Sequence, residues 1–422
     1  MIIPPGWTIA RLDQVADWSS GGTPKAGRRA YYGGDIPWAV IGDLADGAVR
    51  ATANSITQLG LENSSAKIVP AGSVLVAMYG SIGKLGVAGL PMATNQAIAI
   101  AQPREGISRE FLFYYLMSQR DLLNAAGRGG TQRNISQSIL KPWPIPLPPP
   151  DEQCRVVEII EDHLSRLDAA NRALITSTAR ARALIRATLM RAIPDVTEYP
   201  SHWLASTVDH AGSVTLGRQR HPDWHTGDNM QPYLRVANVF EDRIDTSDVM
   251  QMHWPEGTFE RFRLVPGDIL LNEGQTPELL GRPAMYRGEP GEVAFTNSLL
   301  RFQANALVNP EFALIVFRRH MHAGRFTRES RITTNIAHLS ATRLKPIEFP
   351  IAPLDEQERI VLEVRKHLGA VGRLQEGMAD ASLRSRALRR AVLAAAFSGR
   401  LTGAASDGDL IEETAETLEG ER

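Results

Sequence analysis

The side chains best suited to recognise another molecule are arginines, glutamines and asparagines that gather in short, glycine-rich stretches. In the first 150 residues these candidates are Lys25, Arg28, Arg29, Tyr32, Ser81, Lys84, Arg128, Thr131, Gln132, Arg133 and Asn134. Guanidinium and amide groups can form paired hydrogen bonds with the edges of DNA bases, and positive charge positions phosphates. These stretches therefore favour contact with DNA.

The second half of the chain carries a comparable set of candidates. They are Arg218, Arg220, Gln275, Arg328, Arg331, Thr333, Thr334 and Asn335. Segment 318–331 is the most basic of these stretches, because it holds five arginines and one acid, Glu329. Arginine outnumbers lysine by 40 to 6 in the whole chain, so an ordinary surface role is the alternative for any single arginine.

Residue types that would indicate catalysis or a metal site do not come together in the sequence. Gly80–Lys84 is similar to a nucleotide phosphate loop, but Leu85 stands where such a loop needs serine or threonine. His221 and His225 have no third ligand nearby, and the chain has one cysteine. We therefore predict no catalytic residue, no metal site and no cofactor bound by this chain.

The overall composition is that of an ordinary globular protein. The chain has 422 residues, a formal net charge of −1, 43% hydrophobic and 22% charged residues. A charge near zero excludes a generally cationic, histone-like binder. Residues 1–150 nevertheless carry a balance of +4 and residues 194–354 a balance of −3, so the total hides local clusters. Without a signal peptide or membrane-spanning stretch, we expect a cytoplasmic protein.

An internal repeat sets the organisation that positions these candidates. Leu140–Pro142 matches Leu344–Pro346, and Asp151–Gln153 matches Asp355–Gln357, both at an offset of 204 residues. A constant offset over more than forty residues is a strong sign of duplication. We predict globular domains at 1–150 and 198–354, helical regions at 151–197 and 355–403, and an acidic, solvated tail at 404–422.

The two helical regions have the apolar spacing of a coiled coil. Asp151 and Asp355 are the expected N-caps. The expected seam positions are Val157, Ile160, Leu164, Leu167, Ala170, Leu174, Ala181 and Leu184, and in the second copy Val361, Val364, Leu368, Val371, Leu374, Met378, Ala381, Leu388 and Val392. This spacing contains one three-residue skip, at Leu167–Ala170 and Val371–Leu374. We expect an antiparallel pair; two helices packed on separate bodies are the alternative.

The two globular regions are expected to be mixed α/β. Short apolar runs at 73–77, 97–101 and 268–271 predict strands between Gly/Pro turns. The patterns of 111–124 and 312–325 predict amphipathic helices. The fold class is therefore two α/β domains separated by two long helices, with an internal pseudo-two-fold repeat.

Several short motifs resemble those of the specificity (S) subunits of type I restriction–modification systems, of the HsdS type. Each motif is short, but their order, which occurs twice in the chain, is specific. The motifs are Gly21–Lys25, Ile36–Trp38, Asn95–Gln96, Gly129–Ile135 and Pro148–Gln153. The resemblance covers nearly the whole chain. The second copy departs from it, because Gly217–Arg220 and Arg331–Thr334 stand for the first and fourth motifs.

This resemblance implies a non-catalytic subunit that reads a bipartite site on double-stranded DNA. Its partners would be two methyltransferase subunits and two restriction subunits, and S-adenosylmethionine, ATP and magnesium would be bound by those partners in a prokaryotic cytoplasm. The helices would serve as the scaffold, with Asp151, Glu152, Gln153, Arg155, Asp355, Glu356, Gln357 and Arg359 at their starts. The alternative function is a coiled-coil protein scaffold that does not read DNA, for which divergent Arg/Gln/Asn loops in both halves would have no purpose.

Overall fold

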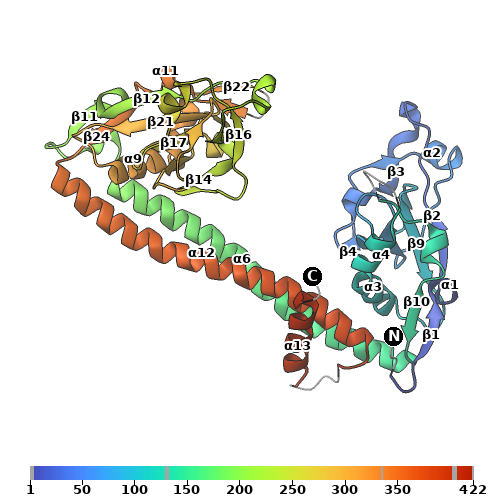
Figure 1. Cartoon of the computed structure of the whole chain (residues 1–422). Helices are drawn as coiled ribbons and strands as arrows, with labels where there is room; N and C mark the ends of the chain where they lie inside the picture. Colours follow the sequence, from blue (N-terminus) through green and yellow to red (C-terminus); the bar gives the residue numbers. More distant parts are fainter. Residues whose placement is uncertain (1–3, 129–132, 334–335, 402–405, 421–422) are drawn as a thin grey trace. The chain divides into compact units, whose positions relative to one another are not determined.

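The chain forms two compact units in a computed structural model that describes residues 4–128, 133–333, 336–401 and 406–420. Unit 1 comprises Met1–Leu174 and Asp380–Arg422, and unit 2 comprises Ile175–Ala379. Each unit contains one α/β domain and one half of each of two long helices, α6 (Pro150–Ala192) and α12 (Leu354–Phe397) (Figure 1). The expected fold class is confirmed.

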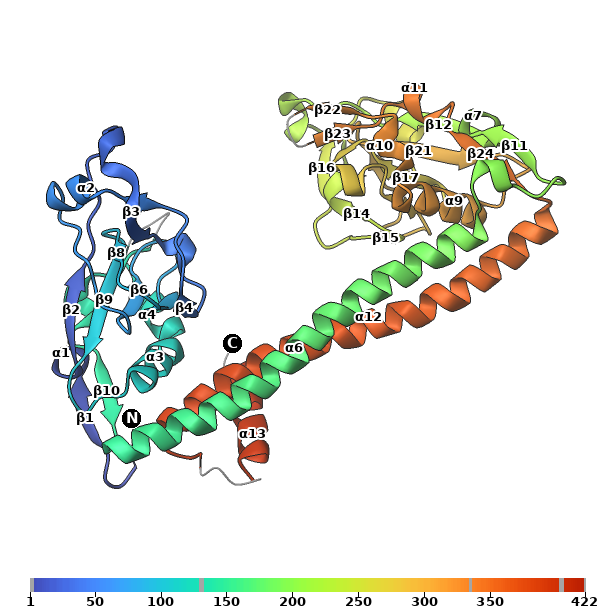
Figure 2. The same cartoon turned by 180° about the vertical axis from the view of Figure 1, so that it is seen from behind.

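Unit 1 is built on a five-stranded sheet of order β2-β9-β6-β7-β4 (Figure 2). Its elements are β1 (Thr8–Arg11), α1 (Leu12–Val15), β2 (Ala16–Ser20), η1 (Arg29–Tyr31), β3 (Tyr32–Ala39), η2 (Ile41–Asp43), β4 (Gly47–Val49), β5 (Ser55–Ile56), α2 (Gln58–Glu62), β6 (Val74–Ala77), β7 (Leu85–Ala88), β8 (Ala93–Thr94), β9 (Ile98–Pro103), α3 (Arg109–Ser118), α4 (Arg120–Ala126), α5 (Gln137–Leu140) and β10 (Pro144–Leu147). The expected strands at 73–77 and 97–101 correspond to β6 and β9, and the expected helix at 111–124 is split into α3 and α4.

Unit 2 repeats the plan with a four-stranded sheet of order β12-β21-β17-β19. Its elements are η3 (Val196–Glu198), β11 (Leu204–Thr207), α7 (Val208–Ala211), β12 (Gly212–Leu216), η4 (Pro222–His225), β13 (Met230–Leu234), η5 (Val236–Asn238), β14 (Val239–Phe240), β15 (Arg243–Ile244), β16 (Met250–His253), α8 (Thr258–Phe262), β17 (Ile269–Asn272), β18 (Gly274–Gln275), η6 (Pro277–Leu279), β19 (Pro283–Met285), β20 (Ala294–Phe295), β21 (Leu299–Ala304), α9 (Pro310–His322), α10 (Arg325–Arg328), β22 (Arg331–Thr333), β23 (Ile336–His338), α11 (Ala341–Leu344) and β24 (Glu348–Ile351). The expected strand at 268–271 is β17, and the expected helix at 312–325 is divided between α9 and α10.

A helix covers the sheet in each unit and joins it to the long helices. Phe111 and Tyr115 of α3 are buried in unit 1, and both rings lie edge-on to Phe397 of α12. In unit 2, α9 lies between the sheet and the long helices, where Phe312 shares a core with Val361 of α12 (Figure 1). Each sheet is thereby fixed to a rigid helical support.

The starts of the long helices are fixed by a glutamine in each. Gln153 accepts a hydrogen bond from Ser108 N and donates to the carbonyl oxygens of Gly106 and Pro148. Gln357 repeats this pattern with Asn309 N and the carbonyl oxygens of Leu307 and Ala352. Both amides are buried, so each ties the first turn of a long helix to the loop before α3 or α9.

The expectation that Asp151 and Asp355 are N-caps was wrong, because each is the second residue of its helix. The helices begin earlier, at Pro150 and Leu354, so each aspartate lies in the first turn. Proline suits the first position because its missing N–H would have no partner inside the helix. A carboxylate in the first turn still interacts favourably with the helix dipole.

The expected three-residue skip in the coiled coil was also wrong. Ala170 is exposed and Leu374 is 62% exposed, while Leu174 and Gln375 are partly buried. Leu184 is 52% exposed and Ala381 is exposed, whereas Ile185 packs on the core of unit 2. The buried positions thus continue with heptad spacing, which keeps the seam facing the partner helix.

Charge explains why the two long helices are antiparallel. Residues 151–168 contain six acids, and residues 169–194 contain none. In the second copy, residues 355–380 contain six acids, and residues 381–406 contain none. In unit 1 Asp168 pairs with Arg389, and in unit 2 Arg191 lies 2.9 Å from Glu363. A parallel pair would set acids against acids. The expectation of an antiparallel coiled coil therefore has a physical basis in the sequence.

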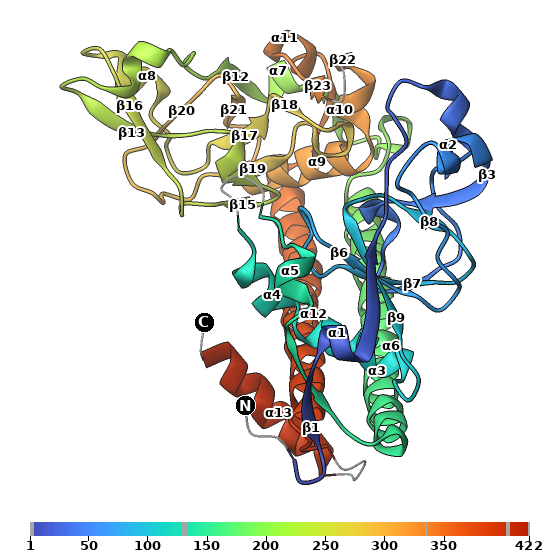
Figure 3. The same ribbon diagram turned by 90° about the vertical axis from the view of Figure 1, so that its right-hand side faces the viewer.

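The C-terminal acidic segment was expected to be a solvated tail, and this was wrong. It contains a helix, α13 (Asp407–Gly420), which lies beside α12 in unit 1 (Figure 3). Ile411 and Ala415 are spaced by one turn and are buried in the core of that unit. Glu412 also pairs with Arg384 of α12 at 2.9 Å. The helical spacing of Ile411 and Ala415, and not the acidic composition, determines that this segment packs on unit 1.

Candidate nucleic-acid interface

In unit 1 the candidate loops leave the same edge of the central sheet. Ser20, at the end of β2, pairs with Ala99 of β9, and Ala77, at the end of β6, pairs with Ile98. The chain after β2 and the chain after β6 therefore start at the same edge of the sheet, on either side of β9. Ile135 N also donates to Met78 O, which brings segment 133–135 to this edge.

The loop after β2 is held closely against its surroundings. A Cβ atom on Gly21 would lie 2.2 Å from Thr94 Oγ1, so only glycine allows this approach. Trp38 Nε1 donates to Gly22 O at 3.0 Å, and Tyr32 Oη donates to Pro24 O at 2.6 Å. The loop is therefore anchored at its base.

Three cationic side chains of this anchored loop are exposed to solvent. Lys25, Arg28 and Arg29 are exposed, and Arg29 is the first residue of η1. Tyr32 differs from its prediction, because it is partly buried and its hydroxyl group holds Pro24. It positions the loop instead of reaching outward.

A second loop of unit 1 is closed by a short backbone ladder. Arg128 and Asn134 exchange two backbone hydrogen bonds of 2.8 and 2.9 Å, and Asn134 also bridges to Tyr79. Arg128, Arg133, Asn134 and Ser81 are exposed around this ladder. The predicted contacts Thr131 and Gln132 lie outside the described residues. The ladder thus brings segments 79–81 and 128–134 together.

Lys84, a predicted DNA contact, forms a hydrogen bond within the domain. Its ammonium group donates to Ile41 O at 3.2 Å, and the side chain is partly buried. Its charge therefore serves a backbone carbonyl within the domain. Tyr79, which sequence reasoning missed, bridges to Asn134 in the ladder and is 40% exposed.

Unit 2 uses the same sheet edge with different loops. Leu216, at the end of β12, pairs with Leu300, and Asn272, at the end of β17, pairs with Leu299. The loops after β12 and β17 therefore begin together, as in unit 1. Gln275 follows in β18, which pairs with β23, and β23 pairs with β22. Arg331 and Thr333 belong to β22, and the predicted contacts Thr334 and Asn335 lie outside the described residues.

The prediction that Arg218 contacts DNA is not supported by its position. The side chain is 9% exposed, and its guanidinium carbon lies 3.9 Å from the ring centre of Trp224 and 4.6 Å from that of Trp254. Its Nη1 donates to His253 O at 2.8 Å. Burial lowers the pKa of Arg218. Arg218 thus holds η4 in place; Arg220 is exposed and lies 5.6 Å from the ring of Tyr233.

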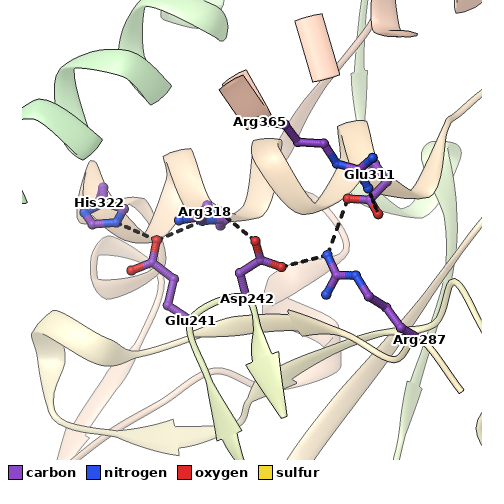
Figure 4. Close-up of polar contacts among 7 residues, drawn as sticks. All are labelled: Glu241, Asp242, Arg287, Glu311, Arg318, His322 and Arg365. Carbon is purple, nitrogen blue, oxygen red and sulfur yellow. Dashed lines mark hydrogen bonds and ion pairs between the residues drawn. The ribbon is translucent and has the colours of Figure 1, made fainter. Parts of the chain in front are cut away.

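The basic segment 318–331 is largely neutralised within the domain, contrary to prediction. Arg318 lies 2.8 Å from Glu241 and 3.2 Å from Asp242, and is 9% exposed (Figure 4). Arg319 pairs with Asp195 at 3.2 Å. The remaining arginines of the segment with described side chains are Arg325, which pairs with Glu329 and Glu348, and Arg328, which is exposed.

The ion pairs of Arg318 belong to a connected network beside α9 of unit 2. Glu241 accepts hydrogen bonds from Arg318 and His322, and Arg287 lies between Asp242 and Glu311 (Figure 4). Burial would raise the pKa of Glu241, but the hydrogen bonds and charges of His322 and Arg318 outweigh it and lower the pKa to about 2. The carboxylate stays ionised and holds the network together.

The scaffold residues have several different roles. Gln153 and Gln357 are the buried amides described above. Glu356 accepts hydrogen bonds from His202 and from Trp203 Nε1 at 2.8 and 3.0 Å and pairs with Arg359. The others are exposed or partly exposed at the helix starts: Asp151, Glu152, Arg155 and Asp355.

Among the described residues, no group of three His, Cys, Asp or Glu side chains is arranged to hold a metal ion. In the same part of the chain no helix has the length and apolar character needed to cross a membrane.

Comparison with known proteins identifies related chains. Residues 4–177 match the type I restriction modification DNA specificity domain. The MjaIX specificity subunit of Methanocaldococcus jannaschii is 29% identical over 163 residues, which are 37% of this chain and 38% of that protein. The EcoKI specificity subunit of Escherichia coli K12 is 22% identical over 429 residues, covering 97% of this chain and 92% of that protein.

A solved structure shares the fold. It belongs to a study of complex assembly and conformational transition of the type I R-M system, and matches with a TM-score of 0.74 at 18% identity, covering 95% of this chain and all of the other. The specificity-domain match covers the α/β domain of unit 1 and α6 as far as residue 177, and the EcoKI subunit aligns with nearly the whole chain. Residues 4–177 thus carry the type I restriction modification DNA specificity domain, and the chain as a whole is similar in length and fold to type I specificity subunits.

Proposed function

We propose that the chain is a non-catalytic subunit that reads a bipartite DNA sequence, one half with each unit. The observation that carries this proposal is the repeated sheet edge, which supports different loops in the two units. Unit 1 presents Lys25, Arg28, Arg29, Arg128 and Arg133 at that edge, and unit 2 presents Arg220 and the β22–β23 hairpin. Equivalent supports with unlike side chains suit two unlike half-sites.

We further propose the partners that such a subunit serves. Two methyltransferase subunits and two restriction subunits would assemble on it in a prokaryotic cytoplasm, with the long helices as the scaffold. S-adenosylmethionine, ATP and magnesium would be held by those partners. The exposed starts of α6 and α12, at Asp151 and Asp355, are equivalent in the repeat and suit two equivalent partners.

The test is methylome sequencing of a host that carries this subunit with its methyltransferase. We expect one motif made of two short half-sites with a fixed gap. Replacing residues 1–150 by the equivalent domain of another subunit should change one half-site and leave the other intact. A contiguous motif, or a change in both halves after the exchange, would contradict the proposal.

A further inference from the structure

A concave, positively charged surface lies in unit 2 away from the sheet edge. It is a groove of about 740 Å³ between the second half of α6 and the segment formed by η6, α9 and α10. Arg182 and Arg186 line one wall, and His322 and Arg328 line the other. Glu278 is the single acid among its lining residues.

The three arginines of the groove differ from neighbouring arginines in their ion pairing. Arg191 on the same helix pairs with Glu363, and Arg325 on α10 pairs with Glu329 and Glu348. Arg182, Arg186 and Arg328 are exposed, and within the described residues none of them has an ion-pair partner. Their positive charge is therefore available to a ligand.

The sequence of α6 maintains this charge. Residues 169–194 contain no acid at all, so no neighbour on the helix can neutralise Arg182 or Arg186. The two arginines are one turn apart, and their Cα atoms are separated by about 6 Å along the helix axis. This spacing is close to the rise of two nucleotides of one DNA strand, at about 3.4 Å per nucleotide.

We infer that this groove binds the phosphodiester backbone of DNA, outside the bases that the loops read. Arg328 links the two regions, because it lines the groove and is three residues from Arg331 at the start of β22. A strand that meets the β22–β23 hairpin is thus led toward Arg182 and Arg186. The inference rests on the proposed function and adds a sequence-independent contact to it.

The test is equilibrium binding of DNA by the assembled methyltransferase complex at several salt concentrations. For Arg182→Gln with Arg186→Gln, we expect the slope of log K against log salt to become shallower by about 2, since each phosphate contact contributes about 0.9. The loss of affinity should be equal for the correct target and for a target with one half-site altered. Arg191→Gln is the matched control, because that arginine is already paired, and it should leave the slope unchanged.

A second variant keeps the inference testable if the arginine variants assemble poorly. Glu278→Gln removes the single acid of the groove and should strengthen binding and steepen the slope. Unchanged slopes in both experiments would overturn the inference. A defect in assembly with an unchanged slope would also overturn it, and would indicate an acidic protein segment as the occupant.

Failure of the proposed function would look different. If the unaltered complex bound all sequences equally, base reading would be refuted, while a slope that depends on Arg182 and Arg186 would still support the groove. If the unaltered complex discriminated between targets and the slope did not respond to these variants, the groove alone would be refuted.

Discussion

Units 1 and 2 hold equivalent loops by different interactions. After β2, glycines pack against the backbone, and an indole and a phenol donate to carbonyl groups of the loop. After β12, Arg218 is enclosed between two indoles and donates to His253 O. The central sheet, the covering helix and the buried glutamine have counterparts in both units, although the sheet has five strands in unit 1 and four in unit 2. A shared frame with different anchors lets one recognition surface change without disturbing the other.

The two units also differ in how they treat charge. In unit 1 the ion pairs between described residues of the α/β domain are mostly exposed, such as Arg104 with Asp17. In unit 2 arginines of α9 are buried and paired. Surface pairs contribute little to stability, whereas breaking a buried pair leaves an uncompensated charge. This difference predicts which unit is sensitive to loss of a cation.

The largest effect is expected for Arg318→Ala. It removes the cation shared by Glu241 and Asp242 and should destabilise unit 2 by about 3 kcal/mol. The measurement is hydrogen exchange, comparing peptides from 204–351 with peptides from 8–147. Arg104→Ala, the control in unit 1, should cost less than about 1 kcal/mol. Equal effects in both units would contradict a difference in sensitivity between them.

The next largest effect is expected in the pH dependence of stability, which should differ between the two units. Burial lowers the pKa of His320 to about 4, although the carboxylate of Glu348 opposes it, so the folded state binds this proton less readily than the unfolded chain. The unfolded state therefore binds more protons between about pH 6.5 and pH 4, and stability falls as pH is lowered through this range. Glu241 stays ionised there, because its pKa is lowered to about 2.

The expected loss in unit 2 is about 2 kcal/mol at pH 5 relative to pH 7. The same exchange experiment at both pH values measures it. His320→Gln should flatten the pH dependence of unit 2 even if it lowers stability at pH 7. A dependence that survives this substitution would show that another group is responsible.

The smallest effects concern the loop anchors. Trp38→Phe removes one hydrogen bond to Gly22 O and should cost about 1 kcal/mol. Arg218→Met removes a hydrogen bond and two cation–π contacts and should cost about 2 kcal/mol. Each should weaken discrimination at one half-site only, as measured by binding to targets altered in either half. Arg218→Lys, which keeps the charge, should restore part of it.

The position of the candidate loops could be predicted in part. The repeat offset and the motif order gave two equivalent domains, and the strand pattern located β6, β9 and β17 to within a residue or two. The convergence of the loops after β2 and β6 could not be read from the chain, because the pairing of distant strands decides it. The burial of Arg218, Arg318 and Arg319 was missed because their acid or aromatic partners lie far away in sequence.

The long helices show the same division between local and tertiary information. Their existence, their apolar seam and their antiparallel pairing follow from the chain, because apolar spacing and separated charges are local properties. Which leucine faces the seam was decided by packing, so Leu374 and Leu184 lie outside it. By itself the sequence determined the elements, the repeat and the kind of side chain in each loop. The tertiary structure decided which arginines remain available, because a cation's partner is set by the fold and not by its neighbours in sequence.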